Sequence, residues 1–399
     1  MGLLDWRAAR RDDEIDAWLT TRAAVDLRCR WREACTRSGL GRPVFTPLGG
    51  PSIAGLPQVV HVHPSARLGD PAHLIVTLPA GMLLDDLEDR ADDLASGLGC
   101  WSVRLRMRGT DYVRVDLIDT DPLAGLVPFL PPAPAGHLVW GVDEYGAVVS
   151  QPLDELTHIV KQGATRSGKS TSSYSLLAQL AHRARTHGDV EVAGLDPTGL
   201  LLGPWGAHPR GWRVVGTDDA PTRYRDALGS LVAEMDRRIA AMPARHDVVP
   251  VGPGCPRIVV VLEEWPAVAR LTGHSRTKPS EVHRLVARLI AEGAKAAIRV
   301  VILVQRAETD FIGAFERDQC ETRLSFGCSD ANTLKLLHDG VTNDTAALHA
   351  TSPKGVALAQ LPGRDLVRIR APWIGGYGAY CDAVAPPADP TAGRLVVAA

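Results

Sequence analysis

The chain has 399 residues, of which 45% are hydrophobic and 23% charged, and its formal net charge at pH 7 is −2. These values are ordinary for a globular protein of roughly two or three domains, and they exclude a strongly basic protein that coats nucleic acid. The seven scattered cysteines contain no C-x-x-C pair, which favours reduced thiols over a disulfide framework or a zinc site. The sequence has no run of about 18 apolar residues, so we expect no membrane-spanning helix.

The first third of the chain predicts a helical segment followed by a small α/β domain. Apolar residues at helical spacing predict one or two amphipathic helices over residues 5–38. Beyond a hinge rich in glycine and proline, the pattern predicts two strands, an acidic helix and a further strand at residues 59–63, 74–78, 83–98 and 101–108. We therefore expect an N-terminal helical segment over 1–45 and an accessory domain over 46–135, which ends in a proline-rich linker.

The last of these strands has an arginine on one face at every second position. Arg104, Arg106 and Arg108 alternate with apolar residues, so their side chains share one side of the strand. Such a row is suited to a phosphate backbone. It is equally suited to a solvated face that pairs with the nearby acidic helix, and the sequence does not decide between the two.

From residue 136 onward, strand-like and helix-like segments alternate. Strands are predicted at 190–195, 212–217, 258–262, 297–305 and 324–328, with helices that include 224–242 and 281–295. This alternation predicts an α/β fold with a mostly parallel sheet that is covered by helices on both faces. We expect this domain to span residues 136–385 and to be followed by a tail over 386–399.

A phosphate-binding loop stands near the start of this domain. Residues 163–170 read G-x-x-x-x-G-K-S, after an apolar strand-like run and before a predicted helix at 173–184. In this setting the backbone N–H groups close around phosphates, the Lys169 ammonium reaches the β- and γ-phosphates, and the Ser170 hydroxyl ligates Mg²⁺. The nucleotide-binding residues predicted here are Gly163, Ala164, Thr165, Arg166, Ser167, Gly168, Lys169, Ser170 and Thr171.

Two further strands end in side chains that hydrolysis requires. The apolar run at 257–262 ends in Glu263 and Glu264, of which we expect the first to hold Mg²⁺ and the second to polarise the attacking water. The apolar run at 300–304 ends in Gln305, whose amide is expected to orient water near the γ-phosphate. The predicted catalytic set therefore contains Lys169, Glu263, Glu264 and Gln305.

In order and wording, these motifs resemble the FtsK/SpoIIIE family of ring-forming DNA translocases, with a RecA-like P-loop NTPase core. Arg166 stands where that family usually has glycine, and Glu263 stands where it usually has aspartate. The resemblance extends to four more segments, at 232–238, 294–298, 304–306 and 321–326. The end of the predicted accessory domain is also similar to that of the family, and the likeness covers roughly residues 58–380.

The resemblance implies a hexameric homo-oligomeric ring that threads double-stranded DNA through its centre and binds ATP between subunits. A neighbouring subunit would supply an arginine to that site, with Arg323 as the first candidate and Arg306 as the second. Asp196 stands in a turn that resembles one of the family, either near the nucleotide or as a cap of the turn itself. ATP and Mg²⁺ are the expected ligands.

The expected function is ATP-dependent translocation of double-stranded DNA, and two alternatives stay open. One keeps the motor and changes the cargo to single-stranded DNA or protein; the other is an ATP-binding scaffold in which Glu263 slows hydrolysis. We expect a form without the membrane anchor of the family, which resembles proteins of actinobacterial mobile elements that transfer DNA between cells. This resemblance implies a cytoplasmic bacterial protein. It also allows that a membrane-bound partner recruits the protein to the membrane periphery.

Overall fold

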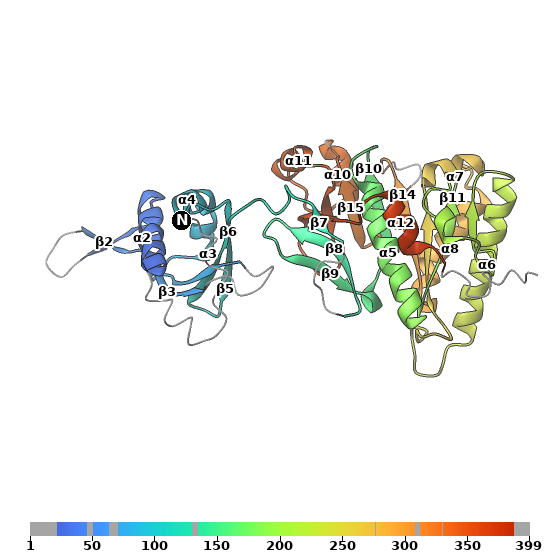
Figure 1. Ribbon diagram of the computed structural model, residues 1–399, viewed down its shortest axis with the longest axis horizontal. Coiled ribbons are helices and arrows are strands. Elements are labelled where there is room, and N and C mark those ends of the chain that lie inside the picture. The colour runs from blue at the N-terminus through green and yellow to red at the C-terminus, as the bar shows by residue number, and fades with distance from the viewer. Residues whose placement is uncertain are drawn as a thin grey trace, which may run out of the picture. The chain divides into compact units, whose positions relative to one another are not determined.

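The structure is a computed structural model, and it describes residues 22–45, 51–63, 71–129, 135–275, 277–307, 312–328 and 330–386 (Figure 1). These residues form two compact units, the first within residues 1–125 and 142–148, the second within 126–141 and 149–399. The start of the predicted N-terminal helices and the predicted tail from 387 onward lie outside the described residues. The four domain boundaries drawn from the sequence stay a prediction.

The first unit is a four-stranded antiparallel sheet with helices on one face. Its elements in chain order are α2 (Arg22–Arg37), β1 (Arg42–Phe45), β2 (Pro51–Gly55), β3 (Gln58–His63), β4 (His73–Thr77), α3 (Leu84–Glu88), α4 (Ala91–Leu98), β5 (Ser102–Arg108) and β6 (Tyr112–Ile118). The strand order is β3-β4-β6-β5, and β1 pairs with β2 in a separate hairpin. Trp31 of α2 and Leu94 of α4 share one core with Leu74 and Val115 of the sheet, so the N-terminal helix is part of this unit.

The prediction of one acidic helix at 83–98 is wrong in one respect, because the structure has two short helices there, α3 and α4. The break falls at Arg90, whose φ of −117° and ψ of 14° are not helical. Five aspartates between residues 85 and 93 explain the break, since aspartate is a weak former of helix interiors. The second helix ends at Gly99 in the left-handed conformation, as the sequence predicts.

The second unit contains the long sheet. Its elements are β7 (Val127–Pro128), β8 (His137–Asp143), β9 (Val148–Pro152), η2 (Leu153–Glu155), β10 (Ile159–Gly163), α5 (Lys169–His187), β11 (Val190–Asp196), η3 (Gly203–Trp205), β12 (Arg213–Val215), α6 (Ala220–Ala240), β13 (Arg257–Leu262), α7 (Trp265–Leu271), α8 (Glu281–Glu292), η4 (Gly293–Ala296), β14 (Ile298–Val304), α9 (Ala314–Gln319), β15 (Thr322–Phe326), α10 (Ala331–Leu337), α11 (Asn343–Ala350), β16 (Val356–Gln360), β17 (Val367–Arg370), β18 (Pro372–Trp373) and α12 (Tyr377–Val384). Of the helices in the described ranges, none combines the length and apolar character needed to cross a lipid bilayer.

This sheet has ten strands in the order β12-β11-β13-β14-β10-β15-β16-β17-β8-β9. The six strands from β12 to β15 pair in parallel, and β16 and β17 continue the sheet antiparallel. The sequence-based prediction of a mostly parallel sheet is confirmed. It did not include the antiparallel extension, in which β16 places Gly355, at its N-terminal end, beside the loop between β10 and α5.

Helices cover both faces of the parallel strands, because successive strand residues point to opposite sides. Val260 and Val300 pack into one core with α6 and α8, whereas Val261 and Val301 pack into a second core with α5 and α12. In Figure 1, α5 and α12 lie side by side across the sheet, and the two helices are in contact. A sheet buried on both faces requires near-continuous apolar strands, which the runs at 258–262 and 300–304 supply.

A lysine stands inside the second of these cores. Lys161 of β10 is fully buried, its Nζ donates to the carbonyl oxygen and the hydroxyl of Ser172 at 3.2 and 3.1 Å, and it lies 5.8 Å from the ring centroid of Trp140. Burial lowers the pKa of its ammonium from 10.5 to about 7. Between these two values the unfolded chain binds a proton that the folded chain does not, so folding stability rises with pH in this range and is lowest below pH 7.

We therefore expect Lys161→Met to raise the free energy of unfolding by about 1–3 kcal/mol at pH 7, because it removes a charged group from an apolar site. The gain should shrink by pH 10, where the folded protein already holds the neutral amine. Urea denaturation at both pH values measures this difference, with the exposed Lys278→Met as the control that should change little. An equal effect of Lys161→Met at both pH values would contradict the assignment.

Candidate nucleotide-binding site

The loop at 163–170 connects the end of β10 to the start of α5, as the sequence predicts. Gly168 caps the helix with a φ of +109°, and a Cβ placed on it would lie 2.5 Å from Cα of Gly355. Only glycine fits a position that combines this backbone with such a close neighbour. Arg166, which replaces a glycine of the family pattern, has a φ of +66° and is exposed at the crest of the loop.

The loop is held from the side by segments far along the chain. The Gly355 N–H donates to the Ser167 carbonyl at 2.8 Å, and a Cβ on Gly327 would meet the Ser167 Cβ at 2.7 Å. Ala164, Thr165 and Arg166 are exposed, so their backbone faces solvent at the helix N-terminus, while Thr171 lies in the first turn of α5. A loop fixed in this way is preorganised for an anion.

Lys169 is almost completely buried, and its ammonium contacts the carboxyl ends of two strands. Its Nζ donates to Oε1 of Glu264 at 3.2 Å and to the Val304 carbonyl at 3.1 Å. These partners follow β13 and end β14, so the ammonium lies at the carboxyl ends of the central strands, where ligands bind in parallel α/β sheets. The lysine lines a pocket of about 210 Å³ together with Ser170, Glu263 and Glu264.

The two carboxylates at the end of β13 differ in their surroundings. Glu264 has a left-handed backbone, with φ 45° and ψ 55°, and this turn starts α7 while its side chain reaches Lys169. A non-glycine residue in that conformation is strained by about 1–3 kcal/mol, a feature that clusters at functional sites. Glu263 is half-buried. Its burial, together with the negative charge of the Glu264 carboxylate, raises the pKa of the Glu263 carboxyl to about 8.

The residues present fit a divalent cation. The Oε2 atom of Glu263 is buried and has no hydrogen-bond partner among the described residues, and Ser170 lines the same pocket. An oxygen donor set of this kind suits Mg²⁺, which commonly uses one or two protein ligands together with phosphate oxygens. No group of three or more histidine, cysteine or acidic side chains in the described part of the chain forms a metal cage of its own.

Gln305 lies in a second pocket, of about 550 Å³, together with Gly163, Ala164 and Thr165. Gln162, which lines the same pocket, holds the segment that follows Gln305: its Oε1 accepts from the Ala307 N–H at 2.9 Å and its Nε2 donates to the Ser325 hydroxyl at 2.7 Å. Ser325 in turn contacts Nε2 of His338 at 2.6 Å. Gln162 is buried and was missed from the sequence, since nothing in a single glutamine before the loop indicates this contact.

Asp196 caps a turn, which was one of the two options from the sequence. It is fully buried, and its carboxylate accepts hydrogen bonds from the backbone N–H groups of Thr198, Gly199, Leu201 and Leu202 at 2.8–3.0 Å. It therefore shapes a loop whose residues Thr198, Leu200 and Leu201 line the smaller pocket. Its carboxylate acts on the pocket through this loop.

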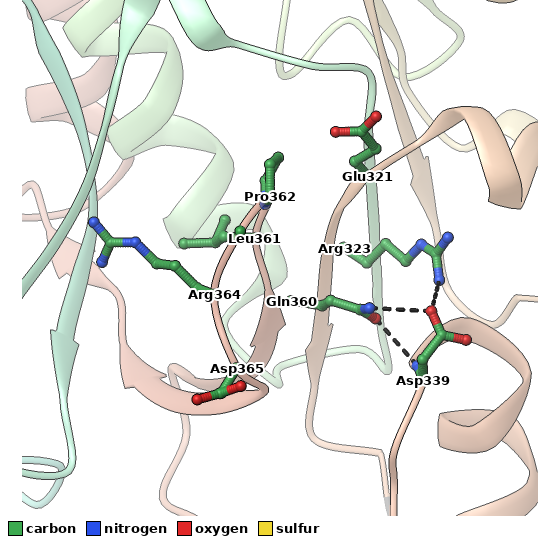
Figure 2. A pocket seen from close by; sticks show the side chains of 9 residues that line it. Glu321, Arg323, Asp339, Gln360, Leu361, Pro362, Arg364 and Asp365 are labelled. Carbon is green, nitrogen blue, oxygen red and sulfur yellow. Dashed lines mark hydrogen bonds and ion pairs between the residues drawn. The ribbon is translucent and has the colours of Figure 1, made fainter.

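The structure places Arg323 apart from these residues, in a polar pocket of about 440 Å³. Figure 2 shows Arg323 and Gln360 directed at the same carboxylate, that of Asp339, with Arg323 Nη1 3.2 Å from Oδ2. The guanidinium also donates to the carbonyls of Arg317, Cys320 and Leu337 at 2.7–3.0 Å, and the side chain is only 11% exposed. Arg306, by contrast, is 60% exposed, pairs with Asp330 at 2.6 Å and lines the Gln305 pocket.

Comparisons with known proteins agree with this geometry. Residues 134–248 match the model of the FtsK/SpoIIIE family. The chain is 25% identical over 286 residues to a DNA translocase FtsK of Halalkalibacterium halodurans, covering 65% of this chain and 35% of that protein. It is 27% identical over 218 residues to a DNA translocase FtsK of Sporosarcina ureae, covering 50% and 26%. The chain thus spans about a third or less of the length of these relatives.

Among solved structures, the cytoplasmic domain of the type VII secretion ATPase EccC from Thermomonospora curvata is similar over 68% of this chain and 35% of that chain, with 17% identity and a TM-score of 0.50. The conjugation coupling protein TcpA of pCW3, in its monomer form with ATPγS, is similar over 87% and 95%, with 16% identity and a TM-score of 0.49. The fold is that of the P-loop ATPases, and residues 134–248 of this chain are similar to the FtsK/SpoIIIE family.

Proposed function

We propose that this chain hydrolyses ATP to translocate double-stranded DNA, and that six copies of it form a ring. The observation that supports this best is the meeting of Lys169, Ser170, Glu263 and Glu264 around one pocket, with Gln305 in the next. The curated relatives of this family domain are named DNA translocases, which directs the proposal to DNA as the cargo. The setting in DNA transfer of a mobile element, and in the bacterial cytoplasm, is part of the same proposal.

The reaction would begin with an exchange of partners at Lys169. Phosphate oxygens of ATP replace Glu264 and the Val304 carbonyl as acceptors of the ammonium, and the backbone N–H groups of residues 163–168 bind the remaining phosphate charge. Glu264 is then released to accept the proton of the attacking water, which Gln305 orients. Mg²⁺ held by Ser170 and Glu263 would neutralise charge that develops on the phosphates.

The test is steady-state ATP hydrolysis by the purified chain, alone, with duplex DNA and with single-stranded DNA. The proposal expects stimulation by the duplex that exceeds stimulation by the single strand. Equal or greater stimulation by single-stranded DNA would indicate that the cargo is single-stranded DNA. Nucleotide binding without turnover on either DNA would instead favour the ATP-binding scaffold.

We also propose that Arg323 acts at the nucleotide of a neighbouring subunit. In the sheet Arg323 pairs with Val160, whereas the phosphate-binding loop follows Gly163, which pairs with Phe326. Arg323 thus stands toward the start of its strand, away from the carboxyl end where its own loop lies. Its bonds to three carbonyls and Asp339 would have to be exchanged during the cycle, which makes a purely structural role the competing explanation.

Mixing two inactive chains separates these roles. A Lys169→Ala chain still offers Arg323, and an Arg323→Ala chain still offers Lys169, so their mixture should regain part of the turnover if the arginine acts across the interface. A structural role predicts a lowered melting temperature of Arg323→Ala and no recovery on mixing. The same mixture with Arg306→Ala tests the second candidate.

A further inference from the structure

The sheet of the first unit has a second face, opposite the core that the described helices share with it. Val103, Val113 and Val115 point toward the helices and share their core. The register of the strands arranges the intervening residues in cross-strand rows: His63, His73, Asp116 and Arg104; His61, Ile75, Arg114 and Arg106; Gln58, Thr77, Tyr112 and Arg108. We call the four arginines of these rows, Arg104, Arg106, Arg108 and Arg114, the arginine face.

Positive charge exceeds negative charge on the arginine face. Asp116 is 1% exposed and accepts from both Arg106 and Arg114, at 2.5 and 2.6 Å, while Arg104 lies 3.6 Å from Asp143. The carboxylates found against these arginines therefore belong to strand positions, not to the acidic helical segment considered from the sequence. Among the ion pairs of the described residues, these four guanidinium groups have two carboxylates, Asp116 and Asp143, and Arg106 and Arg108 are exposed near the C-terminal end of β5.

The spacing of the arginines suits a linear polyanion. Alternate residues of one strand stand roughly 6.6 Å apart, so Arg104, Arg106 and Arg108 cover about 13 Å along β5. Duplex DNA presents one phosphate per about 1.7 Å of its axis, so several phosphates lie within that length. Arginine donates two parallel hydrogen bonds to a phosphate, and Arg106 can do so while Arg114 continues to hold Asp116.

We propose that the arginine face binds the phosphate backbone of double-stranded DNA, as a contact additional to any DNA contact made by the motor unit. The inference rests on the proposed function for the identity of the polyanion, and on the charge and spacing of the face for the site itself. Binding at this face is independent of base sequence, because it involves the phosphates alone.

The experiment titrates the full chain into a fluorescently labelled duplex of arbitrary sequence at several salt concentrations. Arg106→Gln/Arg108→Gln should weaken binding roughly tenfold at low salt and reduce the slope of log affinity against log salt by about 1.8, since each phosphate contact contributes about 0.9. Arg106→Lys/Arg108→Lys keeps the charges and should retain most of the slope. Basal ATP hydrolysis without DNA should be unchanged in both variants.

The matched control is Arg30→Gln/Arg37→Gln, which removes two exposed arginines of α2, on the other layer of the same unit. The proposal that the arginine face binds DNA would be overturned by either of two results. One is an unchanged salt slope in Arg106→Gln/Arg108→Gln, and the other is an equal loss of DNA affinity in the α2 control. Neither result would contradict duplex-stimulated hydrolysis. A wild-type chain that binds no duplex would overturn the proposed function as well. Loss of binding to phosphatidylserine vesicles instead of DNA would assign the face to a membrane surface.

Discussion

Replacing Lys169 with alanine is expected to lower the affinity for ATP by about 10- to 100-fold and to abolish measurable hydrolysis. Lys169 is the one cation among the residues that line the smaller pocket, and a hydrogen bond to a charged group contributes about 1.5–3 kcal/mol. Its loss removes charge stabilisation from the transition state as well as from bound ATP. Titration with a fluorescent ATP analogue and steady-state turnover measure the two effects separately.

The exposed Lys295→Ala is a matched control for Lys169→Ala, and it should bind and hydrolyse ATP as the wild-type chain does. Lys169→Ala also removes a partner of Glu264, so its fold should be checked by its melting temperature. If Lys169→Ala folds normally and still turns over ATP at the wild-type rate, the loop at 163–170 is not the site of hydrolysis, and the central geometry of the account is wrong.

Glu264→Gln is expected to separate binding from hydrolysis. Lys169 leaves residue 264 for the phosphates when ATP binds, and the amide has nearly the same shape as the carboxylate, so ATP affinity should stay near that of the wild-type chain. Turnover should fall about 10²- to 10⁴-fold because an amide cannot accept the proton of the attacking water. The readouts are ATP affinity and single-turnover hydrolysis.

Glu263→Gln provides the comparison within the same dipeptide. We expect Glu263→Gln to shift the Mg²⁺ concentration needed for activity, because the Oε2 atom of Glu263 is buried and accepts no hydrogen bond from the described residues. Near-normal turnover by Glu264→Gln would mean that water is activated by another group, and Gln305 would then be the next residue to test.

The nucleotide site was predictable because its elements are short and local in sequence. The loop at 163–170 begins helix α5 at Lys169, and the apolar runs before Glu263 and Gln305 are buried parallel strands. Parallel strands place their carboxyl ends at one edge of a sheet, so Lys169 and Glu264, which are 95 residues apart in the sequence, meet there. The order of the motifs was enough to predict which residues lie close together, and their role in binding nucleotide stays a prediction.

Contacts that depend on distant parts of the chain were not predictable. The approach of Gly355 to Gly168 requires the antiparallel strands β16 and β17, whose residues have no motif of their own. The enclosure of Arg323 by three backbone carbonyls depends on how α9 and α10 end, and no sequence pattern specifies such acceptors. The sequence also did not identify the carboxylate that pairs with Arg106 and Arg114. That carboxylate belongs to Asp116, which lies on a strand that had not been predicted.

The most direct measurement of the central claim is displacement of a third DNA strand from a triplex at one end of a linear duplex. A chain that moves along double-stranded DNA should release the labelled strand in the presence of ATP and Mg²⁺, and Lys169→Ala and Glu264→Gln should not. Release should also need a stretch of duplex beside the triplex on which the chain can load. If the wild-type chain hydrolyses ATP on duplex DNA and yet leaves the triplex intact, it does not translocate, and the account of this protein as a DNA motor is contradicted.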